Sequence, residues 1–235
     1  MKTFIRTMIL VFVLLLTNQN ILAQQTGFID ADGNKYDTIH HNGYAIMTSN
    51  LKTTKFFNGE PIPRAKKNGL WIASRREKQP AYSMWKGAKK SKKKYGLIYN
   101  LYVVKDYRAL APEGWYIPST EEWRQILGVA KGKDKHWESF HYNEATKKQY
   151  KRSKKSRYRL KKPRWRLNFT GGGMRMWKGE YTFYSKYTDE TLDYEEDSMI
   201  WTSDGYLNLT TNKSYFEEWQ DKNRGYYIRL VKKLD

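Results

Sequence analysis

A stretch near the middle of the chain combines a helix start with an apolar periodicity. Ser119 and Glu122 have the spacing of a capping box, in which each side chain accepts a hydrogen bond from the other residue's backbone amide. Trp123 then begins a series of apolar residues at i, i+3, i+4 and i+7, which places them on one helical face. These patterns predict an amphipathic helix over about 119–130, although Gly128 weakens its second half.

The other apolar positions form short runs between turn residues, a pattern that predicts short antiparallel strands. Within residues 28–47, Asp32-Gly33 and Asn42-Gly43 are strong hairpin-turn signals. A helix combined with many short strands predicts an α+β fold. Further strands are expected at 82–85, 95–104, 199–202 and 226–231, the last of which would pack the C-terminus into a sheet.

Asp30, Asp32 and Asn34 superficially resemble a calcium-binding loop. An EF-hand loop has Gly at its sixth position and Glu at its twelfth, where this chain has Lys35 and His41. A turn is therefore the better interpretation of these carboxylates.

Residues 1–23 have the layout of a secretory signal peptide. Lys2 and Arg6 precede an apolar run, and the small residue Ala23 precedes the expected cleavage point. The apolar run is about half of the roughly 20 residues that a membrane-spanning helix needs, which favours cleavage over a membrane anchor. We therefore expect export, with residues 24–235 forming a single mature domain that has no transmembrane segment.

The chain contains no cysteine. Disulfides, thiol catalysis and zinc–thiolate sites are therefore impossible, and the apolar core must stabilise the exported protein. The 9 Trp, 19 Tyr and 9 Phe residues can supply that core.

The charge of the chain is the strongest functional signal in the sequence. The formal charge is +20, and removal of the signal peptide leaves about +18. Residues 86–94 include six Lys, and residues 147–166 include twelve Lys or Arg and no acid; the second run belongs to a basic insertion over about 132–166. Clusters of this kind attract polyanions, although a solvated face or a disordered loop has the same composition.

We expect the segment 86–94 to project into solvent as a loop or strand end, and to form one electropositive surface with residues 147–166. The expected ligands are an acidic glycan, lipopolysaccharide or an acidic envelope protein. Nucleic acid is disfavoured because export removes the protein from cytoplasmic DNA, and membrane association would come through a partner. The candidate binding residues are Lys89, Lys90, Lys92, Lys93, Lys94, Lys151, Arg152, Lys154, Lys155, Arg157, Arg159, Lys161, Lys162 and Arg164.

Enzyme signatures are missing from the sequence. There is no G-x-S-x-G elbow, no P-loop and no H-E-x-x-H motif, so no catalytic, cofactor-binding or metal residue is assigned. Gly171–Gly173 favours a tight bend over a phosphate cradle, because no helix signal follows it. The acidic run 189–197 could bind calcium, but its spacing matches no known calcium loop, so an acidic surface that balances the protein's own lysines is the favoured interpretation.

Several ordered motifs resemble the Fibrobacter succinogenes major paralogous domain, a family of exported bacterial proteins of Bacteroidetes type. Individually these motifs are unspecific, but together they occur in the family's order and cover nearly the whole mature chain. They are Asp32-Gly33-Asn34-x-Tyr36, Asn50-Leu51-Lys52-Thr53, Pro61-Ile62-Pro63, Tyr95-Gly96-x-x-Tyr99-Asn100, Pro112-x-Gly114-Trp115-x-x-Pro118-Ser119-x-x-Glu122-Trp123, Gly172-Gly173-x-Arg175 and Gly225-Tyr226-x-x-Arg229.

The resemblance implies an irregular α+β domain related to C-type-lectin-like and formylglycine-enzyme-like folds, with no settled activity. Members commonly carry two cysteines at the places of Ala111 and Leu230, so both halves of that implied disulfide are absent here. A packed apolar pair can replace such a bridge, which typically contributes about 2–4 kcal/mol.

These observations predict a non-catalytic envelope protein that binds or scaffolds, located in the periplasm, at the outer membrane or at the cell surface. A structural subunit of an outer-membrane or secretion assembly is one alternative. A glycan-active enzyme is another, which would need two carboxyl groups roughly 5–10 Å apart.

Overall fold

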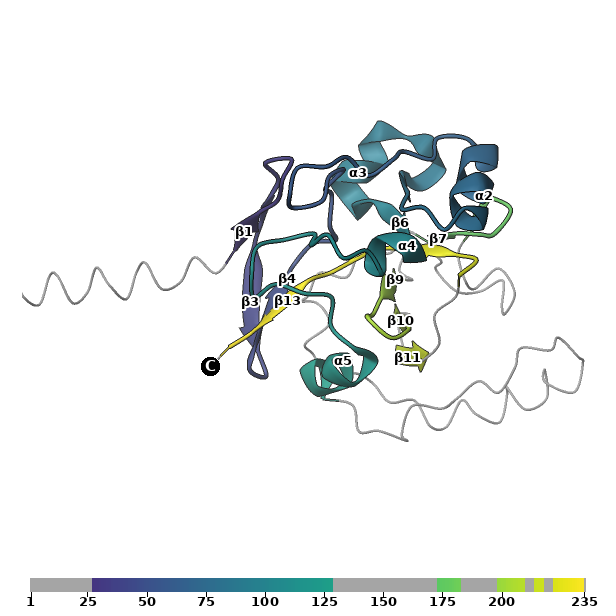
Figure 1. The fold of residues 1–235 in the computed structure, drawn as a ribbon. Coiled ribbons are helices and arrows are strands. Elements are labelled where there is room, and N and C mark those ends of the chain that lie inside the picture. The colour runs from purple at the N-terminus through teal and green to yellow at the C-terminus, as the bar shows by residue number, and fades with distance from the viewer. Residues whose placement is uncertain (1–26, 129–172, 183–197, 210–213, 218–221, 235) are drawn as a thin grey trace, which may run out of the picture.

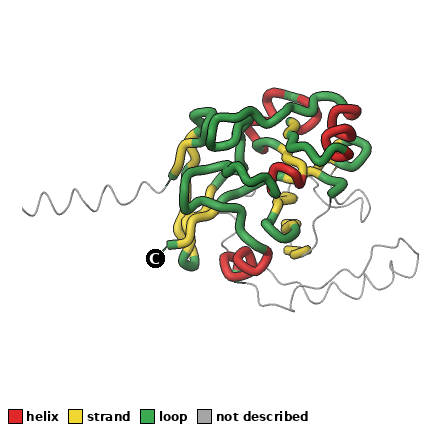
Figure 2. The backbone as a smooth tube through the Cα atoms, viewed as in Figure 1, coloured by secondary structure: helices red, strands yellow, loops and turns green. Residues whose placement is uncertain are grey.

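The computed structural model describes residues 27–128, 173–182, 198–209, 214–217 and 222–234. These residues form an α+β fold in which short antiparallel sheets are joined by long irregular segments (Figures 1 and 2). The α+β class expected from the sequence is confirmed. The basic insertion and the acidic run lie outside the described residues.

The largest sheet has five strands in the order β5-β6-β12-β7-β8. Its central strand, β12, is contributed by the C-terminal part of the chain, while β5 and β6 come from the first half. The strands are β5 (Tyr82–Ser83), β6 (Ile98–Asn100), β7 (Met174–Arg175), β8 (Tyr181–Thr182) and β12 (Gly225–Tyr226).

Two three-stranded sheets lie beside it, in the orders β13-β4-β3 and β11-β10-β9. The Asn42-Gly43 turn joins β3 to β4, as the sequence predicts, and both turn residues have positive φ. The strands are β3 (Thr38–His41), β4 (Tyr44–Met47), β13 (Val231–Lys233), β9 (Ser198–Trp201), β10 (Tyr206–Leu209) and β11 (Ser214–Glu217).

The extended segment 225–233 connects all three of these sheets. After β12, Tyr227 exchanges two hydrogen bonds with β9, accepting from the Trp201 amide at 2.8 Å and donating to the Met199 carbonyl at 3.0 Å. The carbonyl of Ile228 then accepts from the Leu51 amide at 2.8 Å, before the chain enters β13. Every residue from Gly225 to Val231 is buried. The C-terminal segment is therefore the structural centre of the described molecule.

The first hairpin pairs β1 (Phe28–Ile29) with β2 (Lys35–Tyr36). Asp30 closes its turn, because its carboxylate accepts hydrogen bonds from the Asn34 amide at 2.9 Å and from the Tyr36 hydroxyl at 2.6 Å. Burial and the Asp30 carboxylate raise the pKa of Tyr36, so the hydroxyl stays protonated and donates. The turn interpretation of this acidic stretch is confirmed.

The helix predicted from the capping box is α5 (Thr120–Leu127). Both hydrogen bonds of the box are present: the Glu122 amide donates to Ser119 Oγ at 3.2 Å and the Ser119 amide donates to Glu122 Oε2 at 2.8 Å. Gly128, at φ 65°, ends the helix in the left-handed conformation, so the helix is shorter than the expected 119–130. Its buried face includes Trp123, Ile126 and Leu127, which pack on β4, β9 and β10.

Asp204 attaches the start of α5 to the β9–β10 turn. Its carboxylate accepts from the Thr120 amide and from the Thr120 hydroxyl, both at 2.8 Å. Partial burial raises the pKa of Asp204, but hydrogen bonds from Thr120 and Thr202 outweigh that effect. The pKa therefore lies below its ordinary value of 3.8.

Several strand predictions need correction. Of the expected strand 95–104, only β6 is extended, because the Asn100 side chain accepts from the Val103 amide and caps the short helix α4 (Leu101–Val104). The expected strand 82–85 ends after Ser83, and the 3-10 turn η1 (Trp85–Gly87) follows it. The expected loop 86–94 is largely the helix α3 (Lys89–Tyr95), and the expected strand 226–231 is divided between β12 and β13.

The helix α2 (Asn68–Arg76) was not predicted. Its N-cap residue, Lys67, makes no capping side-chain hydrogen bond, and Gly69 weakens its helix propensity. The helix is held by Trp71, which is fully buried between the sheet and η1 in a cluster with Trp85, Ile98 and Tyr227. Tertiary packing rather than local sequence therefore determines α2.

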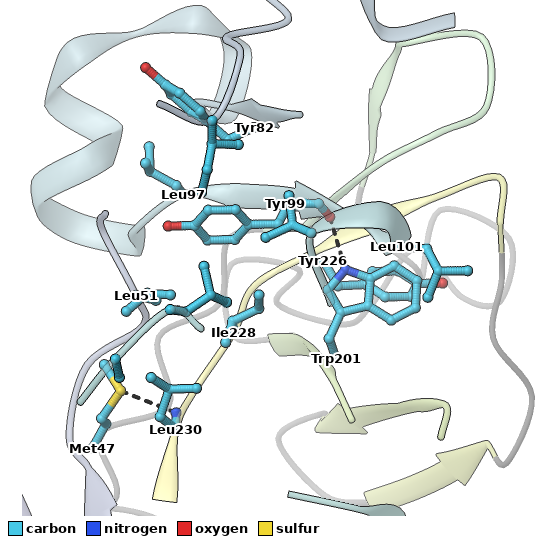
Figure 3. Close-up of a cluster of buried hydrophobic side chains, with 14 of the residues drawn as sticks. Met47, Leu51, Tyr82, Leu97, Tyr99, Leu101, Trp201, Tyr226, Ile228 and Leu230 are labelled. Carbon is cyan, nitrogen blue, oxygen red and sulfur yellow. Dashed lines mark hydrogen bonds between the residues drawn. The ribbon is translucent and has the colours of Figure 1, made fainter. Parts of the chain in front are cut away.

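The main core gathers buried side chains from the five-stranded sheet, β9, the loop after β4 and the C-terminal segment (Figure 3). Trp201 packs against Tyr226 with ring centroids 4.5 Å apart, and its indole nitrogen donates to the Tyr99 carbonyl at 2.8 Å. Ala111 and Leu230, the positions at which the resemblance implies cysteines in other members, are both buried in this core. Apolar packing therefore occupies the positions of the missing bridge.

Gly225→Ala should destabilise the protein, because a Cβ atom there would lie 2.5 Å from Trp71 Cη2 and 2.8 Å from Ile98 Cγ2. We expect the free energy of unfolding to fall by about 1–3 kcal/mol, as in overpacked cores. Gly69→Ala is the matched control, because a Cβ there has no neighbour within 4 Å. Its free energy of unfolding should equal that of the wild type or exceed it by up to about 1 kcal/mol. Urea denaturation measures both. A wild-type midpoint for Gly225→Ala would contradict this packing.

Asp204→Ala should lower the free energy of unfolding at pH 7 by about 1–2 kcal/mol, because two hydrogen bonds to α5 are lost. Since the folded-state pKa lies below the unfolded one, the carboxylate contributes fully above about pH 4. Its contribution disappears as the pH falls through the folded-state pKa. The difference between wild type and variant should therefore shrink in strong acid, as followed by denaturation at a series of pH values. A difference that stays constant down to pH 2 would contradict the role of the ionised carboxylate.

Candidate functional site

The charged motif residue Arg229 lies inside the molecule. It is fully buried, its Nε donates to Asn50 Oδ1 at 2.7 Å, and its Nη1 donates to the Met47 carbonyl at 3.3 Å. Asn50 Nδ2 in turn donates to the Tyr95 carbonyl at 2.8 Å. Burial lowers the pKa of Arg229 to about 9, which leaves the guanidinium charged at neutral pH. The Asn50–Arg229 pair thus joins the C-terminal segment to the loop after β4.

The motif residues Asn100 and Arg175 have similar structural roles. Asn100 Nδ2 donates to the Gln79 carbonyl at 2.8 Å, while its Oδ1 also accepts from the Ala81 amide at 3.0 Å. Arg175 is fully buried, and its Nη1 donates to the Ala65 carbonyl at 2.5 Å. Burial lowers the pKa of Arg175. These side chains make hydrogen bonds within the protein that hold its loops in place.

The comparison with family models identifies the chain. Residues 40–232 match the model described as Fibrobacter succinogenes major domain. The chain belongs to this family. The match begins after the Asp30–Tyr36 hairpin and runs through the C-terminal segment. Neither the curated proteins nor the solved structures gave a match.

In this Fibrobacter succinogenes major domain, α3 forms one part of the described basic surface. Ser91 is the buried residue of this helix, and its hydroxyl donates to the Ala88 carbonyl at 2.6 Å. The helix ends at Gly96, whose φ is +84° and where a Cβ would lie 2.8 Å from Asn50 Cβ. Packing of the two flanking aromatic residues, Trp85 and Tyr95, in the cluster around Trp71 fixes both ends of α3.

The lysines of α3 repel one another. Lys89 and Lys93, and likewise Lys90 and Lys94, are like-charge pairs four residues apart, which destabilise a helix. All four side chains are exposed, and α3 contains no acidic residue. An anion bound along this helix would relieve the repulsion.

Lys92 differs from the other lysines of α3, because it is half-buried and faces Asp32 of the first hairpin. Partial burial raises the pKa of Asp32, but hydrogen bonds from Thr54 and the positive charges of Lys92 and Lys55 outweigh it. The pKa of Asp32 is therefore below its ordinary value. Lys92 is thus placed to stabilise the fold more than to meet a ligand.

The helix α2, which precedes α3, extends the basic surface. This extension was not predicted from the sequence. Between Arg64 and Tyr95 the chain has 12 Lys or Arg and one acid, Glu77. The two helices share the cluster of Trp71, Trp85 and Tyr95, and Figure 1 shows them at the end of the molecule away from α5. We call the exposed cations on and beside α2 and α3 the basic end: Lys66, Lys67, Arg76, Lys78, Lys86, Lys89, Lys90, Lys93 and Lys94.

The structure describes only part of the predicted surface. Lys89, Lys90, Lys92, Lys93 and Lys94 lie together on α3, whereas Lys151, Arg152, Lys154, Lys155, Arg157, Arg159, Lys161, Lys162 and Arg164 lie outside the described residues. The proximity of residues 147–166 to α3 therefore stays a prediction. The excess of Lys and Arg between Arg64 and Tyr95 could have indicated that the region of α2 belongs to the basic surface. No cap or apolar periodicity in the sequence marked the helix itself.

Among the described residues, no three His, Asp or Glu side chains lie close enough together to hold a metal ion. His40 and His41 are on β3, at the edge of its sheet. In the same part of the chain, no helix is long and apolar enough to cross a membrane.

Asn50→Ala should strongly destabilise the protein. It removes the Oδ1 that accepts from the buried Arg229 cation, and the Nδ2 that donates to the Tyr95 carbonyl. We expect a loss of about 2–4 kcal/mol in the free energy of unfolding. Asn58→Ala, at an exposed turn where Oδ1 accepts from the Glu60 amide, should change stability by less than about 0.5–1 kcal/mol. Thermal and urea denaturation compare them. Equal losses for the two variants would show that Arg229 does not depend on Asn50.

Proposed function

We propose that the protein is a non-catalytic binding or scaffolding protein of the cell envelope, which engages a polyanion through the basic end. The observation that carries this proposal is the gathering of nine exposed cations on and beside two helices that share one cluster, in a segment with a single acid, Glu77. Such a surface attracts polyanions by releasing their counterions and by focusing the electric field.

The interior contacts of the family motifs support the same proposal. Arg229, Arg175 and Asn100 hold backbone carbonyls and amides inside the protein. These three motif side chains are therefore engaged in the interior, whereas the cations of the basic end are exposed to a ligand. The expected signal peptide would export the protein, so that envelope polyanions such as acidic glycans and lipopolysaccharide are the nearest partners. The lectin-like relationship implied by the resemblance stays a prediction.

Lys89→Gln/Lys90→Gln should weaken binding to dextran sulfate and reduce its salt dependence. On linear polyanions such as nucleic acids each neutralised charge contributes roughly 0.7–0.9 to the log–log slope, so removal of two cations should reduce the slope by up to about 1.8. Glutamine keeps the helix propensity of lysine and removes the two like-charge pairs of α3, so the thermal transition should stay unchanged or rise slightly. Titrations from low to moderate salt provide the measurement.

The matched control is Lys232→Gln/Lys233→Gln, which removes two exposed charges on β13, away from α2 and α3 (Figure 1). This variant should keep the wild-type slope. Equal reductions in the two double variants would show that net charge rather than the basic end controls binding. Absence of any dextran sulfate binding by the wild type would reject the proposed function.

A further inference from the structure

The β7–β8 hairpin presents a tryptophan to solvent beside the basic end. Trp177 is 52% exposed, one of few large apolar side chains with such exposure among the described residues. It occupies the turn between β7 and β8, which lies next to α2 (Figure 1). The turn is closed by the Gly179 amide, which donates to the Met176 carbonyl at 2.9 Å.

Side chains from the neighbouring elements hold the carbonyls of this turn. Trp71 Nε1 donates to the Met176 carbonyl at 3.1 Å, Arg75 Nη1 donates to the Trp177 carbonyl, and Arg175 Nε donates to the Gly179 carbonyl at 3.1 Å. Gly179 also packs closely on α2, since a Cβ there would lie 2.8 Å from Asn68 Cα. The exposed indole therefore stands on a preorganised backbone, which lowers the entropic cost of binding.

A cation lies against the exposed ring, and further basic residues lie in the same region. Lys178 Nζ lies 4.9 Å from the Trp177 ring centroid. Arg75 is a positioning residue, because its Nη2 also donates to Asn223 Oδ1 at 2.6 Å and its Nε donates to the Lys222 carbonyl at 3.1 Å. These contacts bring the exposed residues Lys178 and Lys222 to the same region as Trp177.

We propose that Trp177 and Lys178 form a sugar-binding subsite for an acidic glycan. The C–H groups of a pyranose ring form an apolar face that can cover the indole, while Lys178 and Lys222 can reach a carboxylate or sulfate substituent. This inference rests on the proposed function, and it specifies the polyanion as a glycan.

The size of the apolar surface favours a glycan over a protein partner. A stable protein interface buries about 800 Å² on each side around an apolar core. Within the described turn between β7 and β8, Trp177 is the exposed large apolar side chain, and one indole matches one sugar ring. A nucleobase would also stack on the ring, so nucleic acid is included as an outcome of the test.

The test compares Trp177→Ala, Trp177→Phe and wild type for binding to oligoguluronate, polyglutamate and oligothymidylate at fixed ionic strength. We expect Trp177→Ala to weaken oligoguluronate binding about five- to tenfold, and Trp177→Phe to weaken it less, because phenylalanine keeps an apolar face. Binding to polyglutamate should change less than twofold. Tyr107→Ala, which removes a side chain that is 92% exposed beside Arg108, is the matched aromatic control and should bind like wild type.

The outcomes separate the two proposals. If wild type binds oligoguluronate and polyglutamate but Trp177→Ala changes neither, or changes both equally, the sugar subsite is wrong and the polyanion proposal stands. Tighter binding of oligothymidylate, lost in Trp177→Ala, would assign the ring to nucleobases instead. If wild type binds none of the three, the proposed function fails as well. Thermal denaturation of each variant checks that the fold is retained.

Discussion

The hydrogen bonding of the C-terminal segment 225–233 is the constraint on which the described fold depends. It supplies the central strand of the five-stranded sheet, bonds to β9 through Tyr227, and ends as an edge strand beside β4. These partners come from opposite ends of the sequence. Pairing of distant residues costs a large loop-closure entropy before the resulting contacts can stabilise the fold. The sheets can therefore assemble fully only when the last part of the chain is present.

A buried cation at this crossing accounts for part of the family pattern. Arg229 lies within the C-terminal segment, and Asn50 orients it from the loop after β4. Removing a guanidinium from water is costly unless acceptors surround it, so the residues that supply them are constrained together. The same reasoning applies to Arg175, which holds carbonyls on two different loops. In an irregular fold with short strands, such side-chain hydrogen bonds replace part of what longer sheets would provide.

The periphery obeys a different constraint. The helix α3 carries unbalanced lysines, and its stability comes from the aromatic residues at its two ends rather than from its own sequence. Packing against Trp71 thus fixes the position of charges that repel each other. The same indole also bonds to the Trp177 turn through its Nε1. One buried tryptophan therefore organises both the basic end and the exposed aromatic ring beside it.

The sequence alone determined the features whose causes are local. The capping box of α5 and the Asp32-Gly33 and Asn42-Gly43 turns follow from neighbouring residues, because hydrogen bonds within a few positions set them. The α+β class follows from the combination of helical and strand patterns along the chain. The lysines of α3 were identified by charge, but their helix, α2 and the helical turn after Asn100 were not predicted. Tertiary packing decided these elements: Trp71 is fully buried and Tyr95 partly buried in a cluster that includes Tyr227, far away in the sequence, and no local pattern encodes that contact. The arrangement of Trp177, Arg75 and Asn223 likewise joins three distant segments, so only the tertiary structure could bring them together.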